Sequence, residues 1–350
     1  RLPRASRITV IHSPDCPDQS TNGKIFFGDS QSVLVNFGGT SNLTTGKGQY
    51  VVLTKEGTAS NVTAGDGALI LTSDLGGKSG ANTIGLNTGA NVSVVASGAS
   101  TVPVTVNAAG GNLFFLNQGA GSGVINPGNG NVTVVGNATD LGGRTTLFGG
   151  TNSVVVSNGQ GEFTGGTAGK NQMFSSTVTG SATLTGGGNN DLLYSLGKGN
   201  MLIAGAGSET LVGRSAGSSE ANTFIVGSGF ATVFGGGQGG NLYLFRGMGS
   251  GLIDGRDEAA AGVASQNNYE EFGAEPGGTH LIGDFVTGTD VLITNGADST
   301  VTFFTANQGG SPFGANAGTQ VLLSTGTRYW FFDTGADGKQ DIFATDIFKA

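Results

Sequence analysis

The stretch that decides the fold is "GGGNNDLLYSLGKGNMLIAGAGSETLV", residues 186–212. A large apolar residue recurs at every ninth position, as Leu193, Leu202 and Leu211. The residues between them are rich in Gly and Asn, which supply the backbone conformations that tight turns need. A unit of this length holds one short strand and one turn, so two units would close a coil of about 18 residues around an apolar interior.

The same rhythm continues after residue 212, with small insertions between the apolar positions. Because stacked coils place equivalent residues above one another, we expect these apolar side chains to point inward and form one core stack. The predicted core stack consists of Leu193, Leu202, Leu211, Phe224, Val233, Tyr243 and Leu252.

The composition agrees with a solenoid and excludes other classes. Glycine accounts for 67 of 350 residues, which is too many for ordinary helices, and the 7 prolines are too few for collagen. Hydrophobic residues make up 37% of the chain, with 21 Phe, so a core can be buried and disorder is not expected. We therefore predict an all-β protein, a parallel β-solenoid (β-roll or β-helix) with a C-terminal β-strand cap domain.

The charge and the cysteine content limit the partners. The chain has 16 Lys and Arg against 24 Asp and Glu, a net charge of -8, and no basic run, so we expect no nucleic-acid partner. No apolar run is long enough for a membrane span. The single Cys16 cannot form an internal disulfide, so packing and hydrogen bonds must hold the coils.

Composition shifts along the chain predict four regions. Residues 1–24, with three prolines, are expected to form an N-terminal arm, and residues 25–253 the parallel β-solenoid of degenerate Gly/Asn-rich repeats. Residues 254–276 are charged and Ala-rich, and we expect a linker there. Residues 277–350 contain longer alternating strands such as "TVTFFTA", and we expect a closing β domain.

These residues give the chain a resemblance to the RTX family of bacterial proteins secreted by type I systems. Gly186, Gly187, Asp191 and Leu193 match the nonapeptide G-G-x-G-x-D-x-U-x, where U is a large apolar residue. The segment 277–293 is similar to the one that closes RTX rolls, and the last ten residues, "DIFATDIFKA", resemble an uncleaved secretion signal. The matching positions of the closing segment are Ile282, Asp284, Phe285, Gly288, Asp290 and Leu292.

The resemblance implies secretion to the cell surface or beyond, and it implies Ca²⁺ held between adjacent coils by carboxylates and turn carbonyls. Asp191 and Glu209 are one coil apart, so they are the pair most suited to bind Ca²⁺. Asp284 and Asp290 are weaker metal candidates. The alternative is that Asp191 and Glu209 are solvated turn residues. At the positions where the RTX nonapeptide has Asp, the other repeats of this chain have mostly Asn, so few calcium sites are expected.

Several short motifs match catalytic or ligand-binding patterns without the necessary context. Gly213–Gly217 matches G-x-S-x-G, and Gly235–Gly240 matches G-x-G-x-x-G, but neither lies between a strand and a helix. His12 with Asp15, Cys16 and Asp18 lies in an irregular Pro-rich segment. His280 and Asp284 are interpreted as a pair on the strand surface of the closing segment. The sequence contains no HExxH motif, which is typical of zinc proteases. We predict no catalytic residue and no enzyme.

Asn-x-Thr/Ser triplets are frequent, and we interpret their Asn and Thr as turn and face residues of the solenoid rather than glycosylation sites. They begin at Asn42, Asn61, Asn91, Asn131 and Asn137.

The sequence thus favours a secreted bacterial structural protein that self-assembles into an extracellular filament, matrix or surface layer. Its partner would be itself, through the N-terminal arm and the C-terminal domain, because unpaired strand edges tend to pair with another chain. The alternative is an adhesin or a solenoid that binds polysaccharide, including cell-surface polysaccharide, or ice. A polysaccharide-acting enzyme is a third hypothesis.

Overall fold

The fold comes from a computed structural model. It describes residues 7–11, 24–26, 31–36, 40–54, 59–74, 82–86, 90–96, 103–108, 110–136, 144–157, 160–175, 181–197, 199–213, 221–236, 240–246, 248–255, 266–272, 277–283, 285–295, 297–304, 317–332 and 346–349. Over these residues the chain is all-β without an α-helix, so the predicted fold class is confirmed. The described part also has no helix with the length and hydropathy needed to span a membrane.

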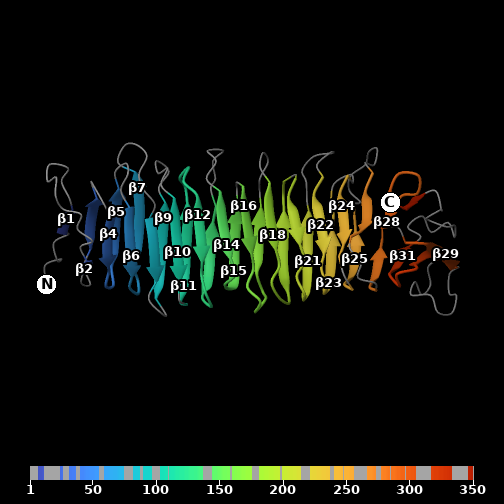
Figure 1. The fold of residues 1–350 in the computed structure, drawn as a ribbon, viewed down its shortest axis with the longest axis horizontal. Helices are drawn as coiled ribbons and strands as arrows, with labels where there is room; N and C mark the ends of the chain where they lie inside the picture. Colours follow the sequence, from blue (N-terminus) through green and yellow to red (C-terminus); the bar gives the residue numbers. More distant parts are fainter. Residues whose placement is uncertain are drawn as a thin grey trace. The chain divides into compact units, whose positions relative to one another are not determined.

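The chain divides into two compact units, Arg1–Thr167 (unit 1) and Ala168–Ala350 (unit 2), and each is a parallel β-solenoid built from two sheets (Figure 1). In unit 1, sheet A consists of β1 (Arg7–Ile11), β3 (Ser32–Asn36), β5 (Gln49–Thr54), β7 (Leu69–Asp74), β9 (Asn91–Ala96), β11 (Asn112–Asn117), β13 (Asn131–Val135) and β15 (Thr151–Ser157). Sheet B consists of β2 (Lys24–Phe26), β4 (Thr40–Thr44), β6 (Ala59–Ala64), β8 (Asn82–Leu86), β10 (Val104–Ala108), β12 (Gly123–Asn126), β14 (Thr145–Phe148) and β16 (Gly161–Thr164).

Unit 2 repeats this arrangement. Its sheet A consists of β17 (Gln172–Ser175), β19 (Asp191–Ser195), β21 (Ser208–Gly213), β23 (Phe230–Phe234), β25 (Ser250–Asp254), β27 (Thr279–Ile282), β29 (Ser299–Phe304), β30 (Gly318–Leu323) and β31 (Arg328–Phe332). Its sheet B consists of β18 (Ala182–Thr185), β20 (Met201–Ile203), β22 (Thr223–Val226), β24 (Leu242–Phe245), β26 (Asn268–Glu271), β28 (Val291–Thr294) and β32 (Ile347–Lys349).

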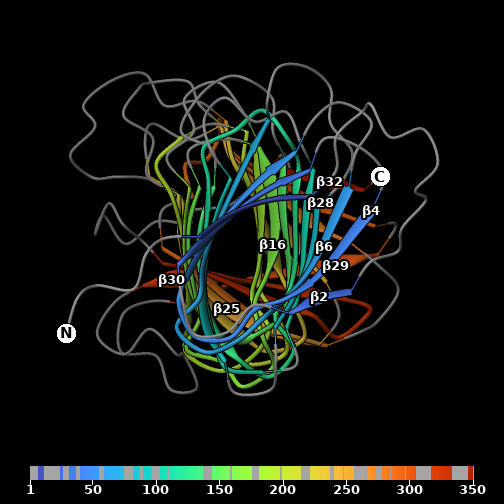
Figure 2. The ribbon, with the colours of Figure 1, turned by 90° about the vertical axis from the view of Figure 1, so that its left-hand side faces the viewer.

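The chain alternates between the two sheets, and each strand pairs in parallel with the strand one coil away. In unit 1, β4 pairs with β2 and β6, and Figure 2 shows the three strands on the same side of the coils. In unit 2, Asp191 of β19 is opposite Glu209 of β21. Parallel pairing between successive coils fixes which side chains form columns along the stack.

The interior is formed by every second residue of each strand. All members of the predicted core stack except Leu252 are fully buried. Leu252 is 40% exposed, and its neighbour Ile253 is buried instead. Ile253, rather than Leu252, lies opposite the buried Val233, so Leu252 points to the outer face of the sheet. Successive side chains of a strand alternate between the two faces, so a shift of one residue in register exchanges inward and outward positions.

Close stacking of the turns explains much of the glycine content. A Cβ added to Gly166 of unit 1 would lie 1.3 Å from the carbonyl oxygen of Gly150. A Cβ added to Gly249 of unit 2 would lie 1.7 Å from the carbonyl oxygen of Gly227. Only glycine permits this backbone-to-backbone approach between coils.

A buried ladder of amide side chains joins the turns before the sheet B strands of unit 2. Asn222 Oδ1 accepts the backbone N–H of Asn200 at 3.0 Å, and Asn241 Oδ1 accepts that of Asn222 at 3.0 Å. Asn267 continues the ladder, and Asp290 ends it by accepting the Asn267 N–H at 2.8 Å. Each coil therefore satisfies a buried backbone donor of the coil before it.

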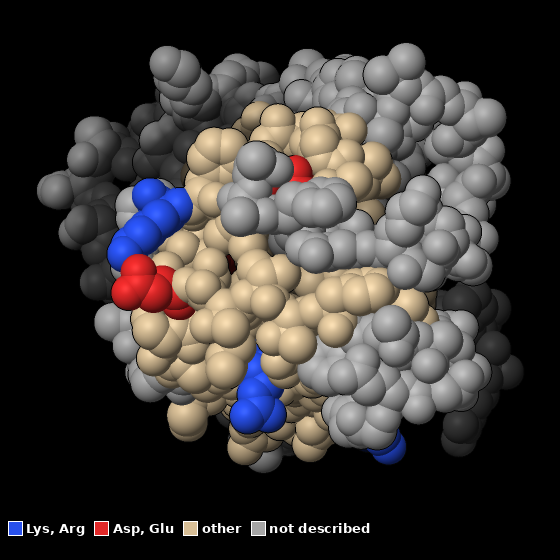
Figure 3. Space-filling model, turned by 90° about the vertical axis from the view of Figure 1, so that its right-hand side faces the viewer, with Lys and Arg blue, Asp and Glu red and all other residues tan. Residues whose placement is uncertain are grey.

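The C-terminal part of unit 2 changes its pairing. β31 continues sheet A in parallel beside β27, whereas β30 and β29 follow as antiparallel strands. The face in Figure 3, on the side where Figure 1 places β29 and β31, is mostly uncharged over its described residues.

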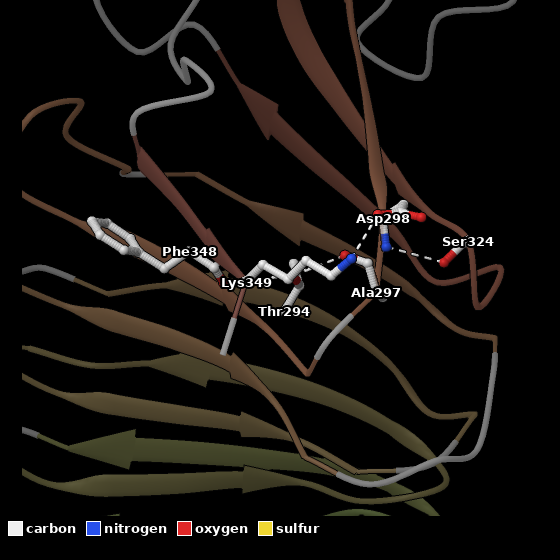
Figure 4. Close-up of polar contacts among 6 residues, drawn as sticks. All are labelled: Thr294, Ala297, Asp298, Ser324, Phe348 and Lys349. Atoms are coloured by element: carbon white, nitrogen blue, oxygen red, sulfur yellow. Dashed lines mark hydrogen bonds and ion pairs between the residues drawn. The ribbon is translucent and has the colours of Figure 1, made fainter.

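Polar contacts fix β32 beside the β29–β30 pair. Lys349 Nζ donates to Asp298 Oδ1 at 2.7 Å, and the Asp298 N–H donates to Ser324 Oγ at 3.1 Å (Figure 4). Thr294 donates to the carbonyl oxygen of Ala297 at 3.1 Å. The last described strand is therefore tied both to sheet B and to the antiparallel strands.

Two regions predicted to be irregular contain strands. The arm predicted for residues 1–24 includes β1, which pairs with β3. The linker predicted for residues 254–276 includes β26, which lies between β24 and β28 in sheet B. β26 is mostly polar, but its buried Tyr269 stacks on Tyr243 of β24, with ring centroids 4.9 Å apart, and so continues the core by one coil.

The amide ladder gives the first prediction. Replacing Asn222 with Ala removes the acceptor of the buried Asn200 N–H, and we expect a loss of about 1–3 kcal/mol of unfolding free energy. The matched control is Asn126→Ala on the outer face of unit 1, where we expect a change within about 0.5 kcal/mol. Denaturant unfolding measures both, and equal losses would contradict a structural role for the ladder.

Candidate functional site

The predicted carboxylate pair is brought together inside unit 2. Asp191 and Glu209 occupy opposite positions on β19 and β21, and both side chains are buried, Glu209 being only 3% exposed. An added Cβ at Gly186 would lie 3.3 Å from Asp191 Oδ2 and 3.5 Å from Glu209 Oε1. The two carboxylates therefore share one small region beneath the turns, and they are not solvated turn residues.

Backbone N–H groups, rather than carbonyl oxygens, surround these carboxylates. Asp191 Oδ2 accepts the N–H groups of Gly187 and Gly188 at 2.8 and 3.0 Å, and its Oδ1 accepts the Asn171 N–H at 2.8 Å. Glu209 Oε1 accepts the N–H groups of Gly205 and Gly207 at 3.2 and 3.3 Å. Glu209 Oε2 is buried and has no hydrogen-bond partner among the described residues.

This donor arrangement does not fit calcium. Ca²⁺ takes six to eight oxygen ligands, whereas three of the four carboxylate oxygens here already accept N–H groups whose hydrogens would face the ion. The part of the chain that the structure describes also contains no group of three or more His, Cys, Asp or Glu suited to a metal. Asp191 and Glu209 serve instead as acceptors for the turns.

The surroundings of Glu209 favour its protonated form. Burial, the largest cause, raises the pKa of Glu209 above its ordinary value, and the nearby charge of Asp191 raises it further, against the two glycine N–H bonds. Folded Glu209 therefore holds its proton more tightly than unfolded Glu209. The unfolding free energy must fall as the pH rises through the interval between the two pKa values and stay lower above it.

The Glu209→Gln variant should therefore be more stable than the wild type above this interval and no more stable below it, because its side chain never ionises. The Asp191→Asn variant should lose about 1–3 kcal/mol of unfolding free energy at neutral pH. Its side-chain NH₂ group would replace an oxygen that accepts backbone N–H groups in the wild type, so donors would face donors. Thermal unfolding of both variants across pH measures the difference. Equal destabilisation by the two substitutions would contradict this assignment of donors and acceptors.

The second predicted metal pair is only partly described. Asp284 lies outside the described residues. Asp290 is buried, and its Oδ2 accepts the Val286 N–H at 2.9 Å while its Oδ1 ends the amide ladder. Asp346 holds the same turn from the other side, accepting the Thr287 hydroxyl at 2.6 Å and the Gly288 N–H at 3.1 Å. Asp290 therefore acts as a structural acceptor in the closing segment.

His280 lies in the core rather than in a surface pair. Its ring centroid is 4.1 Å from that of Phe245 and 5.3 Å from that of Tyr329, and neither ring nitrogen has a hydrogen-bond partner among the described residues. Burial lowers the pKa of His280 from 6.5 to about 3. Burial also raises the pKa of Tyr329 well above its ordinary value, with the Glu271 charge as a second cause. His280 is therefore neutral near pH 7.

Because unfolded His280 binds a proton more readily than folded His280, the unfolding free energy should fall as the pH drops from 6.5 towards about 3. The His280→Phe variant should lose this part of the acid sensitivity. The difference in unfolding free energy between variant and wild type at each pH isolates the contribution of His280, because the other histidine, His12, is present in both proteins. A difference that does not change between pH 7 and pH 4 would contradict a neutral, buried His280.

The remaining motifs give no catalytic arrangement in the described residues. Ser215 of the G-x-S-x-G match, Gly237 of the G-x-G-x-x-G match and His12, Asp15, Cys16 and Asp18 all lie outside the described residues.

One column of outward side chains on sheet A of unit 2 is apolar over successive coils, beside a column that contains Thr210 and Thr232. Phe174, Tyr194, Val212 and Phe234 follow one another as paired residues. Phe230 and Phe234 are 44% and 42% exposed, and Leu252 lies beside them. We call this surface the aromatic face: Phe174, Tyr194, Val212, Phe230, Phe234 and Leu252.

The outer face of sheet B in unit 2 carries a second group of apolar side chains, together with Thr223. Met201 and Ile203 of β20 alternate with the buried Leu202, and the pattern continues on β22 and β24. Opposite residues pair from coil to coil, such as Ile203 with Ile225. We call this surface the aliphatic face: Met201, Ile203, Ile225, Leu242 and Leu244. Sequence reasoning missed both faces because it followed the inward positions only.

Comparison with known proteins adds no assignment: no family model matches the chain, and neither a curated protein nor a solved structure matches it. The structure supports a β-roll type of repeat protein, and the narrower RTX resemblance rests on the motifs of residues 186–293.

Proposed function

We propose that this protein is an extracellular structural protein that assembles with copies of itself into a filament, matrix or surface layer. The observation that carries the proposal is the pair of apolar outer faces of unit 2, one on each sheet. Apolar side chains that continue over several rungs on two faces are unusual on a monomeric soluble protein and favour burial against a partner.

A second copy is the partner that suits these faces best. The residues that define the aromatic and aliphatic faces are uncharged, and the columns continue into acidic residues only beyond them, at Asp254 opposite Phe234 and at Glu270 opposite Leu244. Rungs about 4.8 Å apart are matched in spacing by another stack of the same strands. One self-complementary face would give only a dimer, whereas two faces per copy permit open-ended growth.

The RTX resemblance supplies the extracellular part of the proposal. The resemblance rests on the nonapeptides and the closing segment of residues 186–293. The described coils hold together through buried acceptors and apolar columns, and this internal support suits a protein that must persist outside the cell.

Charge placed on the aromatic face tests the proposal. In the Phe234→Lys, Leu252→Lys double variant, association through the aromatic face would bury two ammonium groups, so we expect extended assemblies to give way to monomers or to dimers joined through the aliphatic face. The matched control is Phe148→Lys in β14 of unit 1, an exposed phenylalanine outside both faces, which should assemble like the wild type. Sedimentation velocity and negative-stain electron microscopy measure the outcome.

A wild-type protein that stays monomeric at every concentration tested would refute the structural role. Assembly of the double variant equal to that of the wild type would show that the aromatic face is not the contact.

A further inference from the structure

Unit 1 has a groove on the outer face of its sheet A, about 630 Å³ in volume. The groove crosses β9, β11 and β13 and reaches the turn at Gly67 on one side and Asn152 on the other. Its lining includes a row of amides and one aromatic ring, Phe114, which is 37% exposed. It lies on different strands from the aromatic and aliphatic faces.

The amides form an ordered ladder along the groove. Asn91 Nδ2 donates to Asp66 Oδ1 at 2.8 Å, and Asn112 donates in turn to Asn91 Oδ1. Asn131 Nδ2 donates to Asn112 Oδ1 at 2.8 Å, and Asn152 Nδ2 donates to Asn131 Oδ1 at 3.2 Å. An amide has two N–H donors and an oxygen with two lone pairs, so the ladder leaves donors and acceptors of these exposed side chains for a ligand.

The backbone departs from regular geometry to place the last amide. The pairing of β13 with β15 shifts register after Asn131, where β15 contains an extra residue. Asn152 lies in this bulge with φ of 47°, the left-handed region that non-glycine residues rarely adopt. Bulges reorient side chains, and this one aligns Asn152 with the column that ends at Asn131. The local strain is therefore associated with extending the ladder.

The lining favours a ligand that is neutral and rich in hydroxyl groups. Hydroxyls both donate and accept, as do the free sites of the amides and the hydroxyls of Ser93 and Thr133 in the same groove. The described residues that line the groove include no charged side chain. An ion pair between Lys47 and Asp66, with 3.8 Å between Nζ and Oδ2, lies beside Asn91 at its end. An anionic polymer would find no row of cations there.

The position of the groove argues against a peptide strand. A peptide is usually bound by backbone pairing at a sheet edge, whereas this groove lies across the face of a sheet whose strands are already paired on both sides. Phe114 offers instead an apolar surface to the C–H face of a sugar ring. Rungs about 4.8 Å apart present equivalent groups at intervals comparable to the advance of one sugar in an extended chain.

We propose that this groove binds one strand of a neutral polysaccharide, running along the direction in which the coils of unit 1 stack. Asn91, Asn112 and Asn131 hydrogen-bond to successive sugars, and Phe114 packs against one ring. This site adds a partner to the proposed structural role and does not depend on self-assembly.

Biolayer interferometry with immobilised cello-, laminari- and xylo-oligosaccharides, and with oligoalginate as the anionic arm, tests the proposal on the full chain. We expect wild-type binding to at least one neutral glycan and none to oligoalginate. Asn112→Ala and Phe114→Ala should each weaken that binding about tenfold or more. Asn126→Ala is the matched control, because Asn126 donates to Asn107 at 2.9 Å in a similar outer ladder on sheet B, away from the groove.

Binding to none of the three neutral glycans would overturn the proposal, as would binding confined to oligoalginate. Unchanged affinity in Phe114→Ala would also overturn it, and this variant removes an exposed ring that the core does not need. The Phe234→Lys, Leu252→Lys double variant should bind glycan at each immobilised site as the wild type does, so loss of assembly and loss of binding are separate results.

Discussion

Buried backbone N–H groups at the turns are the constraint on which this structure depends. A solenoid stacks its turns as closely as its strands, so donors there are removed from water and need acceptors from the next coil. In unit 2 the acceptors are the side chains of Asn222, Asn241, Asn267 and Asp290. On the other side of the coil, Asp191 performs the same task for the N–H of Asn171, whereas Glu209 accepts N–H groups of its own turn. These columns fix the register of each coil on the next.

This constraint also determines where function can lie. In unit 2 the buried carboxylates and amides such as Asp191 and Asn222 are used as acceptors, and His280 is enclosed by aromatic rings. Binding to other molecules must therefore involve the outward residues, which the strands arrange in columns. Unit 2 presents apolar columns suited to another protein surface, and unit 1 presents an amide column suited to hydroxyl groups. The repeat thus supplies two different kinds of surface on one scaffold.

The inward pattern was predictable from the sequence because it is a local rhythm. The spacing of Leu193, Leu202 and Leu211 predicted both the fold class and the opposite positions of Asp191 and Glu209. The spacing predicted the wrong inward residue at Leu252, because the length of the preceding turn shifts the register by one residue and Ile253 is buried instead. The role of the two carboxylates was not predictable, because it depends on whether turn N–H groups or carbonyl oxygens face them.

The outward columns were not predictable from periodicity either. Asn91, Asn112 and Asn131 are separated by unequal intervals, and they align only after each coil has taken up its own insertions. The position of Asn152 depends further on a bulge that has no clear sequence signature. The signal available in the sequence was the repeated Asn-Val-Thr/Ser triplet at Asn91 and Asn131, which indicates a face residue without naming its neighbours.

We expect the outer faces of unit 2 to associate while the groove of unit 1 stays open. Cryo-electron microscopy of the assembled protein shows both features in one measurement. Tyr194, Val212 and Phe234 of one copy should pack against an apolar face of another, with Asn112 and Phe114 accessible. Assemblies joined only through strand edges, or through contacts that fill the groove, would contradict it.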